Sequence, residues 1–276
     1  MRDVSELCRL VRLPCQDASW FTAANRDFPL LVPRGYVARI RPGDPHDPLL
    51  RQVLPLKEET RPVPGFTADP VAEARSILAP GLLQKYRGRV LLVATSACAV
   101  HCRYCFRRHF PYSEQTALRH WHRNLDAVRR MPEVTELILS GGDPLTLSDH
   151  RLEALLTEAA GLPQLRRLRI HTRLPVVLPS RITARLVALL SGNRLRSVIV
   201  IHVNHPREVT AELRQALEPL VRAGIQLLNQ AVLLKSVNDD ADTLISLSES
   251  LFDIGVLPYY LHLLDPVAGA AHFQVP

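Results

Sequence analysis

Three cysteines within a stretch of eight residues constrain this chain more than any other feature of its sequence. Cys98, Cys102 and Cys105 follow one another at offsets of four and three, directly after an apolar run that ends at Ala94. Three thiolates can bind three irons of a [4Fe–4S] cluster, whereas four cysteines would leave no iron open to a small molecule. The spacing therefore predicts a cluster with one free coordination site, to which the amino and carboxylate groups of S-adenosylmethionine could bind.

Two other interpretations of the same cysteines stay open. Cysteines at i, i+4 and i+7 share one face of a helix, and cysteines are often simply buried in a core. The neighbours His101, Arg103, Arg107 and Arg108 make this a poor core helix. Alternatively, the thiols and a nearby histidine, His101 or His109, could bind zinc, although structural zinc sites usually take their ligands from two separated pairs.

Length and cysteine count limit the class of protein. The chain has 276 residues, enough for one large α/β barrel or two ordinary domains. The five cysteines are an odd number, and the chain opens without a secretory leader. Because such a pattern does not suit a disulfide framework, we expect reduced thiols and a cytoplasmic location. No apolar run is long enough to span a bilayer, so we expect no membrane partner.

The charge is basic and comes almost entirely from arginine. The formal net charge is +7, with lysine only at positions 57, 85 and 235. This balance suits small carboxylates or phosphates, which the planar guanidinium fork binds well, or nucleic acid. An aromatic content of 5% argues against a stacking platform for nucleic acid, and we expect no such partner. A basic, zinc-stabilised binding protein is the alternative from another functional class.

The pattern of apolar residues predicts an α/β fold. Residues 1–84 are rich in proline and predict an irregular extension with a helix near residues 4–11, in which Cys8 and Cys15 are packing residues. Residues 85–276 alternate between apolar runs and helical patterns, which predicts a partial (β/α)6 barrel of parallel strands. The predicted strands are 89–95, 136–140, 167–172, 197–203, 226–234 and 256–263, and the predicted helices are 116–130, 148–160, 181–191, 207–223 and 239–254.

Polar residues follow each predicted strand. The carboxyl ends of parallel barrel strands form the active-site face, so we expect these residues to meet at one mouth. Gly141 and Gly142 lack a Cβ atom and would let a ligand approach the backbone closely. The basic turn of Lys85, Tyr86 and Arg89 could hold a phosphate, or it is simply a solvated turn. The residues at the strand ends are Cys98, Cys102, Cys105, Ser140, Gly141, Gly142, Asp143, His171, Thr172, Arg173, His202, Asn204, His205, Asn229, Gln230, His262 and Asp265.

Six longer segments form a pattern that single motifs do not: residues 98–112, 140–144, 173–179, 204–206, 229–234 and 258–265. Together they resemble the lysine 2,3-aminomutase family, within the radical S-adenosylmethionine superfamily. The likeness runs from about residue 45 to residue 276 and is closest to the members that make (R)-β-lysine for modifying elongation factor P. The resemblance implies an isomerase that acts on L-lysine, with an electron donor for its cluster.

The resemblance also implies roles for single residues. It implies that Cys98, Cys102 and Cys105 bind the cluster, and that Arg107 and Asp265 bind the carboxylate and the distal amino group of lysine. Residues 140–143 would lie beside the amino group of S-adenosylmethionine. The cofactor-binding residues that it implies are Ser140, Gly141, Gly142, Asp143, His202 and Gln230 for S-adenosylmethionine, and Lys85, Tyr86 and Arg89 for pyridoxal phosphate.

The family's mechanism implies what these cofactors do. One electron from the cluster cleaves the sulfonium, and the resulting 5′-deoxyadenosyl radical takes a hydrogen from the β-carbon of lysine while pyridoxal phosphate carries the migrating nitrogen. In the family, a segment beyond the counterpart of residue 276 holds the Schiff-base lysine and a second substrate aspartate. We therefore expect residues 1–276 to hold pyridoxal phosphate weakly, with altered or absent aminomutase activity as the alternative.

Overall fold

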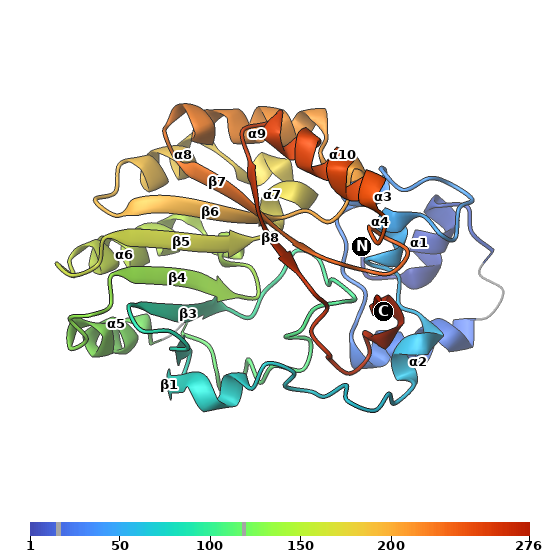
Figure 1. Ribbon diagram of the computed structural model, residues 1–276, viewed down its shortest axis with the longest axis horizontal. Helices are drawn as coiled ribbons and strands as arrows, with labels where there is room; N and C mark the ends of the chain where they lie inside the picture. The colour runs from blue at the N-terminus through green and yellow to red at the C-terminus, as the bar shows by residue number, and fades with distance from the viewer. Residues whose placement is uncertain (15–17, 118–119) are drawn as a thin grey trace.

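The chain folds around one open sheet of eight strands in the order β1-β2-β3-β4-β5-β6-β7-β8. The computed structural model describes residues 1–14, 18–117 and 120–276. Six strands run parallel and follow the chain order across the sheet, as Figure 1 shows. They are β3 (Arg89–Thr95), β4 (Glu136–Gly141), β5 (Arg167–Thr172), β6 (Arg196–His202), β7 (Gln226–Val232) and β8 (Leu257–His262). The predicted α/β class and its six parallel strands are confirmed.

A short hairpin precedes these strands and was not predicted. Strands β1 (Ile77–Ala79) and β2 (Leu82–Leu83) are antiparallel, and β2 pairs with β3. Gly81, in the turn between them, has a φ of 80°, and a Cβ there would lie 2.4 Å from the backbone nitrogen of Ala117. The hairpin belongs to the predicted extension, residues 1–84, but pairs with the sheet. The predicted domain boundary between residues 84 and 85 stays a prediction.

Each parallel strand presents alternate side chains to the two faces of the sheet. Leu92, Leu139, Ile170, Ile199 and Leu227 pair in register across five strands, and all are fully or almost fully buried. Because side chains alternate along a strand, their neighbours point to the opposite face, which surrounds the cavity described below. The row of apolar residues therefore forms the core, and the polar residues between them are left for the site.

Helices after the strands cover the core row. They are α5 (Trp121–Arg129), α6 (Asp149–Ala160), α8 (Ala184–Ser191), α9 (Ala211–Arg222) and α10 (Ala241–Phe252), with the short α7 (Leu174–Val177) after β5. The side chains of Ser148, Thr183, Thr210 and Asp240 accept hydrogen bonds at the amino ends of α6, α8, α9 and α10, which satisfies otherwise unpaired backbone donors. Helix α5 begins later than predicted because Ala117 still donates to the carbonyl of Val93, 2.8 Å away, beside the sheet.

The N-terminal extension packs beyond the carboxyl ends of the strands. Figure 1 shows its helices α1 (Val4–Leu10), α2 (Ala18–Asp27), α3 (Arg34–Val37) and α4 (Pro48–Arg51) past the arrowheads of β4 and β5. Leu7, Tyr36 and Leu49 are fully buried in the same apolar cluster as the barrel strands. Cys8 is buried there too, as predicted for a packing residue, whereas Cys15 lies outside the described residues.

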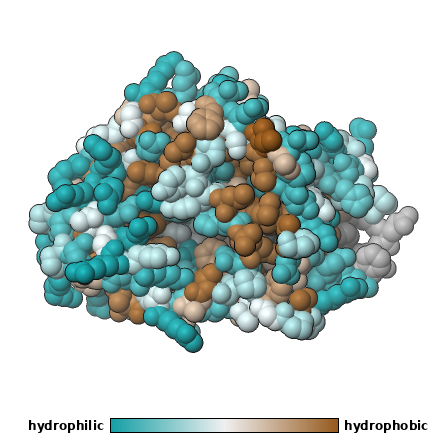
Figure 2. Space-filling model, viewed as in Figure 1, coloured by the Kyte–Doolittle hydropathy of each residue, from teal (hydrophilic) through white to brown (hydrophobic). Residues whose placement is uncertain are grey.

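An apolar patch lies on one face of the molecule, surrounded by hydrophilic residues. Figure 2 shows apolar side chains gathered over the middle of the face along which β8 runs in Figure 1. Leu257, Leu261 and Leu263 are among the exposed residues there, at 39%, 56% and 78%. Within the described residues, no helix has the length and the apolar composition that crossing a bilayer would require.

Candidate active site

A cavity of about 700 Å³ opens at the carboxyl ends of the parallel strands. Its walls come from the strand residues that alternate with the core row, such as Ser140 on β4 and His171 on β5. Every residue with a predicted catalytic, cofactor-binding or cluster-binding role lines this cavity, although the role of each stays a prediction. These residues are Lys85, Tyr86, Arg89, Cys98, Cys102, Cys105, Arg107, Ser140, Gly141, Gly142, Asp143, His202, Gln230 and Asp265. Three strand-end residues that were expected at the mouth do not line it: Asn204, His205 and Asn229 instead hydrogen-bond to other parts of the protein.

The three cysteines lie on a loop of turns after β3, so the core-helix interpretation is wrong. The loop is anchored by Arg103, whose side chain is fully buried. Its Nε donates to Oε1 of Glu59 at 2.9 Å and its Nη1 donates to the carbonyl of Phe28 at 2.6 Å. Arg103 thus faces the N-terminal extension, which leaves the cysteines on the cavity side.

The pKa values of two of the thiols, those of Cys98 and Cys105, are raised. Burial raises the pKa of Cys105 to about 11, and the neighbouring Cys102 adds to this shift. Burial, followed by the charge of Cys105, also raises the pKa of Cys98. A bound metal centre reverses this balance because it stabilises the thiolate directly.

The three thiols line one cavity, and in a [4Fe–4S] cluster each cysteine binds a different iron. In the described part of the chain, no group of three His, Cys, Asp or Glu side chains that could hold a single metal ion is found.

The two glycines at the end of β4, Gly141 and Gly142, allow a close approach of two backbone segments. A Cβ on Gly142 would lie 2.3 Å from the carbonyl oxygen of Ala97, in the segment that leads into Cys98. Gly141 has a φ of 121°, and its carbonyl accepts from the hydroxyl of Tyr112 at 2.7 Å. These glycines hold the cysteine loop against β4 as well as lining the cavity.

Asp143 is buried and uses its carboxylate within the protein. The carboxylate accepts from the hydroxyl of Thr172 at 2.7 Å and from the backbone nitrogens of Arg173 and Leu174 at 2.8 and 2.9 Å. Burial nevertheless raises its pKa, and these hydrogen bonds oppose that rise. Asp143 therefore fixes the end of β5 relative to β4.

Arg107 lies in the cavity wall and is held by a residue that was not predicted. Its Nε and Nη2 donate to the two carboxylate oxygens of Glu73, at 2.9 and 2.6 Å, and its Nη1 donates to Oγ of Ser140 at 2.8 Å. Burial acts to lower the pKa of Arg107, but the bond to Glu73 outweighs it and the pKa is raised. Glu73 compensates the charge of Arg107 and fixes its guanidinium, whose remaining N–H donors on Nη1 and Nη2 can bind an anion.

Two cavity histidines are neutral at physiological pH. Burial lowers the pKa of His171 to about 4 and that of His202 to about 3. His171 Nδ1 lies 3.0 Å from Oε1 of Gln230, and His202 Nε2 lies 3.3 Å from the hydroxyl of Tyr104. These side chains can thus serve as neutral hydrogen-bonding groups for a polar ligand.

No protein-family model matches the chain, but curated relatives align with nearly all of it. The L-lysine 2,3-aminomutase of Escherichia coli K12 is 50% identical over 275 residues, which make up 99% of this chain and 80% of the relative. That of Haemophilus influenzae is 46% identical over 274 residues, covering 99% and 81%. The chain belongs to the L-lysine 2,3-aminomutase family. The predicted family is confirmed, and so is the prediction of an enzyme of this isomerase type.

A more distant relative also aligns with nearly all of this chain. The L-lysine 2,3-aminomutase of Clostridium subterminale is 34% identical over 276 residues, covering 99% of this chain and 66% of the relative. Among solved structures, the one described as native anSMEcpe with bound AdoMet covers 63% of this chain and 50% of its own at 14% identity, with a TM-score of 0.48. That structural likeness is too distant to add to the family assignment.

The remaining predicted residues of this aminomutase-family chain lie around the same cavity. Tyr86 is 64% exposed, and the guanidinium carbon of Arg89 lies 5.3 Å from the centre of its ring. Nζ of Lys85 donates to the carbonyl of Val71 at 3.0 Å. Burial raises the pKa of Asp265, an effect that a bound cation would oppose. Of the three lysines, all within the described residues, Lys85 alone lines the cavity.

Several functional candidates were absent from the predicted set. Glu59 and Glu73 lie in the extension and were missed because their partners, Arg103 and Arg107, are 44 and 34 residues away along the chain. Arg173 was noted only as a strand-end residue, yet its Nη1 lies 2.8 Å from the sulfur of Cys102. The sequence offered two signals for it: its position directly after a predicted barrel strand, and its place at the start of segment 173–179, which carries the family resemblance.

Proposed function

We propose that this chain is a radical S-adenosylmethionine enzyme that converts L-lysine into (R)-β-lysine. The observation that carries the proposal is that three thiols, an arginine and an aspartate line one and the same cavity. Membership of the L-lysine 2,3-aminomutase family supports the same reaction. The arrangement supports Cys98, Cys102 and Cys105 as ligands of a [4Fe–4S] cluster.

The surroundings of the thiols suit S-adenosylmethionine. Ser140, His202 and Gln230 offer neutral polar groups, and the glycines at the end of β4 leave backbone accessible to a ligand. When bound together, the cluster and S-adenosylmethionine supply a carbon radical by one-electron chemistry. The protein contributes the orientation of the reactants and a pocket that restricts access of solvent.

Arg107 and Asp265 suit the two ends of lysine. The guanidinium of Arg107 is fixed by Glu73 and offers charge-assisted hydrogen bonds to a carboxylate. The half-buried carboxylate of Asp265 has a raised pKa, so a substrate ammonium beside it would recover the cost of its burial. We assign the carboxylate of the substrate to Arg107 and its distal amino group to Asp265.

Lys85, Tyr86 and Arg89 suit the phosphate of pyridoxal phosphate. Two cations and a phenol line one side of the cavity, which is the set of donors that a phosphate accepts from. The cofactor, when bound, supplies the group that carries the migrating nitrogen. These three residues would orient it toward the thiols.

The electron donor, the cellular location and the fate of the product are also part of the proposal. The cluster needs a one-electron donor, and thiols that bind iron persist in the reducing cytoplasm, which is where we locate the enzyme. We propose that the β-lysine produced is destined for modification of elongation factor P.

An anaerobic assay tests the reaction. The protein is reconstituted with iron, sulfide and pyridoxal phosphate, and is supplied with S-adenosylmethionine, dithionite and L-lysine. We expect both β-lysine and 5′-deoxyadenosine, and loss of both in a Cys102→Ser variant. Formation of neither product by the reconstituted wild-type protein would contradict the proposal.

The absorbance of the protein tests pyridoxal phosphate separately. A visible band that disappears with borohydride would show cofactor bound through an amine. We expect phosphate contacts to persist even where this band is weak, so Arg89→Gln should lower the affinity for pyridoxal phosphate without reducing the iron content. An unchanged affinity for pyridoxal phosphate in this variant would show that Arg89 does not bind the phosphate.

A further inference from the structure

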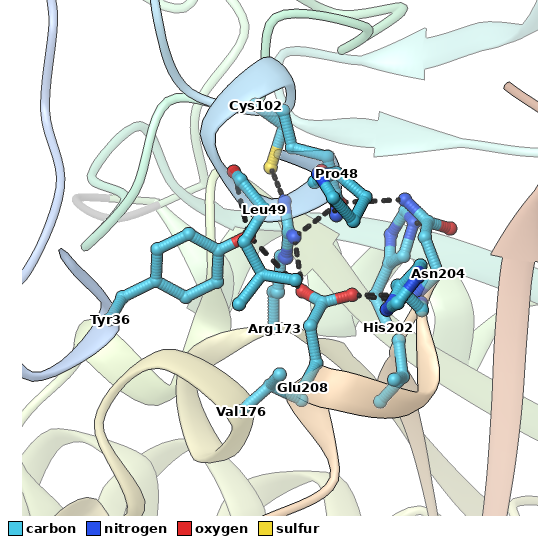
Figure 3. A network of polar contacts seen from close by, with 12 residues as sticks. Tyr36, Pro48, Leu49, Cys102, Arg173, Val176, His202, Asn204 and Glu208 are labelled. Carbon is cyan, nitrogen blue, oxygen red and sulfur yellow. Dashed lines mark hydrogen bonds and ion pairs between the residues drawn. The ribbon is translucent and has the colours of Figure 1, made fainter. Parts of the chain in front are cut away.

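The guanidinium of Arg173 contacts one thiol of the cysteine triplet. Its Nη1 donates to Sγ of Cys102 at 2.8 Å, from a side chain that is 5% exposed. Figure 3 shows this contact, with the guanidinium pointing from the end of β5 toward the sulfur. Among the side-chain hydrogen bonds of the described residues, this is the one that reaches a thiol of the triplet.

Arg173 is held in its orientation toward the sulfur because the second amino group of its guanidinium, Nη2, is also hydrogen-bonded. Its Nη2 donates to Oε1 of Glu208 and to Oε1 of Gln52, both at 2.6 Å. Glu208 is itself fully buried, and its second oxygen accepts from the backbone nitrogen of Asn204 at 2.8 Å. The ion pair is therefore tied to the backbone after β6.

Two aromatic rings complete the cage around the guanidinium. Its central carbon lies 5.7 Å from the ring centre of Tyr36 and 5.6 Å from that of Tyr104. The backbone nitrogen of Arg173 is fixed in turn by Asp143, at 2.8 Å. Residues from the extension, the cysteine loop, the segment after β4 and the segment after β6 thus converge to keep one cation against one sulfur.

A hydrogen bond and a positive charge at a ligand sulfur favour the reduced cluster, because reduction adds one negative charge. Hydrogen bonds to the sulfurs are among the factors that set cluster potentials, and groups behind the ligands tune metal sites generally. We infer that Arg173 is a positioning residue that acts through Cys102 to raise the reduction potential of the cluster. The inference deepens the proposed function and rests on its cluster.

The test compares the reduction potential of reconstituted variants. Arg173→Gln combined with Glu208→Gln removes the contact without leaving a buried charge unpaired. Arg173→Lys keeps the charge but not the planar fork. The matched control is Arg169→Gln with Glu136→Gln. It removes a second ion pair, bonded at 2.8 Å, between a buried glutamate and a partly buried arginine that lines the same cavity. Each protein is titrated anaerobically with dithionite, a one-electron reductant, without S-adenosylmethionine, and the reduced cluster is followed by electron paramagnetic resonance.

We expect the double variant to be at least tenfold harder to reduce, which is a potential more negative by about 59 mV for one electron. Arg173→Lys should lie between the double variant and the wild type, and the control should match the wild type. A double variant with the wild-type potential would overturn the inference. If that variant holds no cluster, a wild-type potential in Arg173→Lys would overturn it instead. Absence of a cluster from the wild-type protein would contradict the proposed function itself, which separates the two failures.

Discussion

Glu59 ties the cysteine loop to the N-terminal extension through two arginines. Its carboxylate accepts from Nε of Arg103 at 2.9 Å and from Nη2 of Arg108 at 2.9 Å, and all three side chains are almost completely buried. Removing one partner from a buried ion pair leaves an uncompensated charge, which costs far more than breaking a pair at the surface. Here a single carboxylate compensates two guanidinium groups.

We therefore expect Glu59→Gln to lower the free energy of unfolding by about 3–5 kcal/mol, measured by urea denaturation. The control is Glu153→Gln, which breaks the exposed pair between Arg185 and Glu153, whose side chains are 65% and 53% accessible. This control should cost less than about 1 kcal/mol. Equal effects of the two substitutions would contradict the importance of Glu59.

Gly142 illustrates a backbone position that a methyl group would disrupt. A Cβ there would lie 2.3 Å from the carbonyl oxygen of Ala97 and 2.7 Å from the carbonyl carbon of Ser96. Because both contacts are to backbone, relief requires the segment before Cys98 to move. The matched position is Gly35 in α3, where a Cβ would meet nothing within 4 Å.

Gly142→Ala should lower both the unfolding free energy and the iron bound per chain after reconstitution, whereas Gly35→Ala should change neither appreciably. The expected loss of stability is on the order of 1–3 kcal/mol, typical of overpacking. Wild-type iron content in Gly142→Ala would show that β4 and the cysteine loop do not need this close approach.

At the scale of elements, the 3-10 helix η2 (Glu73–Ser76) positions Arg107. Its first residue, Glu73, is aimed inward by a turn in which Ala72 has a φ of 51° and the carboxylate of Asp69 accepts from the nitrogen of Glu73 at 2.9 Å. Glu73 then holds two edges of the guanidinium of Arg107. If Arg107 binds the substrate carboxylate as proposed, Glu73 fixes its direction.

Glu73→Gln should then raise the KM for L-lysine by about tenfold, with a smaller effect on kcat, since a charge-assisted hydrogen bond contributes more than about 1 kcal/mol. Glu114→Gln, an exposed glutamate of the loop after the cysteines, is the control and should leave KM unchanged. A lower KM in Glu73→Gln would instead show that Glu73 competes with the substrate for Arg107.

A buried histidine at the end of β5 makes the stability of the protein depend on pH. The pKa of His171, at the end of β5, is lowered from 6.5 to about 4 by burial. The unfolded chain therefore takes up a proton first as the pH falls, so stability present above about pH 6.5 is lost toward pH 4. The loss attributable to this residue is on the order of 3 kcal/mol by pH 4.

In apoprotein, His171→Asn should reduce the fall in unfolding free energy between about pH 7 and about pH 5. The control is His150→Asn, at an exposed position on α6. In this variant we expect the unfolding free energy to fall with pH as much as in the wild type. Identical pH profiles for His171→Asn and the wild type would mean that His171 is not desolvated in the folded protein.

The sequence allowed the strands and most of the cavity to be predicted for one physical reason. Parallel strands that are buried on both faces favour near-continuous apolar runs, and those runs end where the polar cavity residues begin. The hairpin of β1 and β2 escaped prediction because three and two residues are too few to show a period. Glu59 and Glu73 escaped because long-range ion pairs leave no local pattern in the sequence.

At the scale of the whole molecule, the extension completes the wall of the site. Tyr36 and Gln52 reach Arg173, Glu59 holds the cysteine loop, and Glu73 holds Arg107. The sequence predicted the extension but not these contacts, since they depend on how it folds back over the carboxyl ends of the strands. We expect loss of the extension to abolish iron binding as well as stability.

The central claim is that three thiols hold a [4Fe–4S] cluster with one iron open to S-adenosylmethionine. The most direct test is electron paramagnetic resonance of the reduced, reconstituted wild-type protein before and after addition of S-adenosylmethionine, with iron and sulfide measured on the same sample. The account predicts about four iron and four sulfide per chain and a spectrum that changes when S-adenosylmethionine is added. Bound zinc without sulfide, or a cluster whose spectrum does not respond to S-adenosylmethionine, would contradict it.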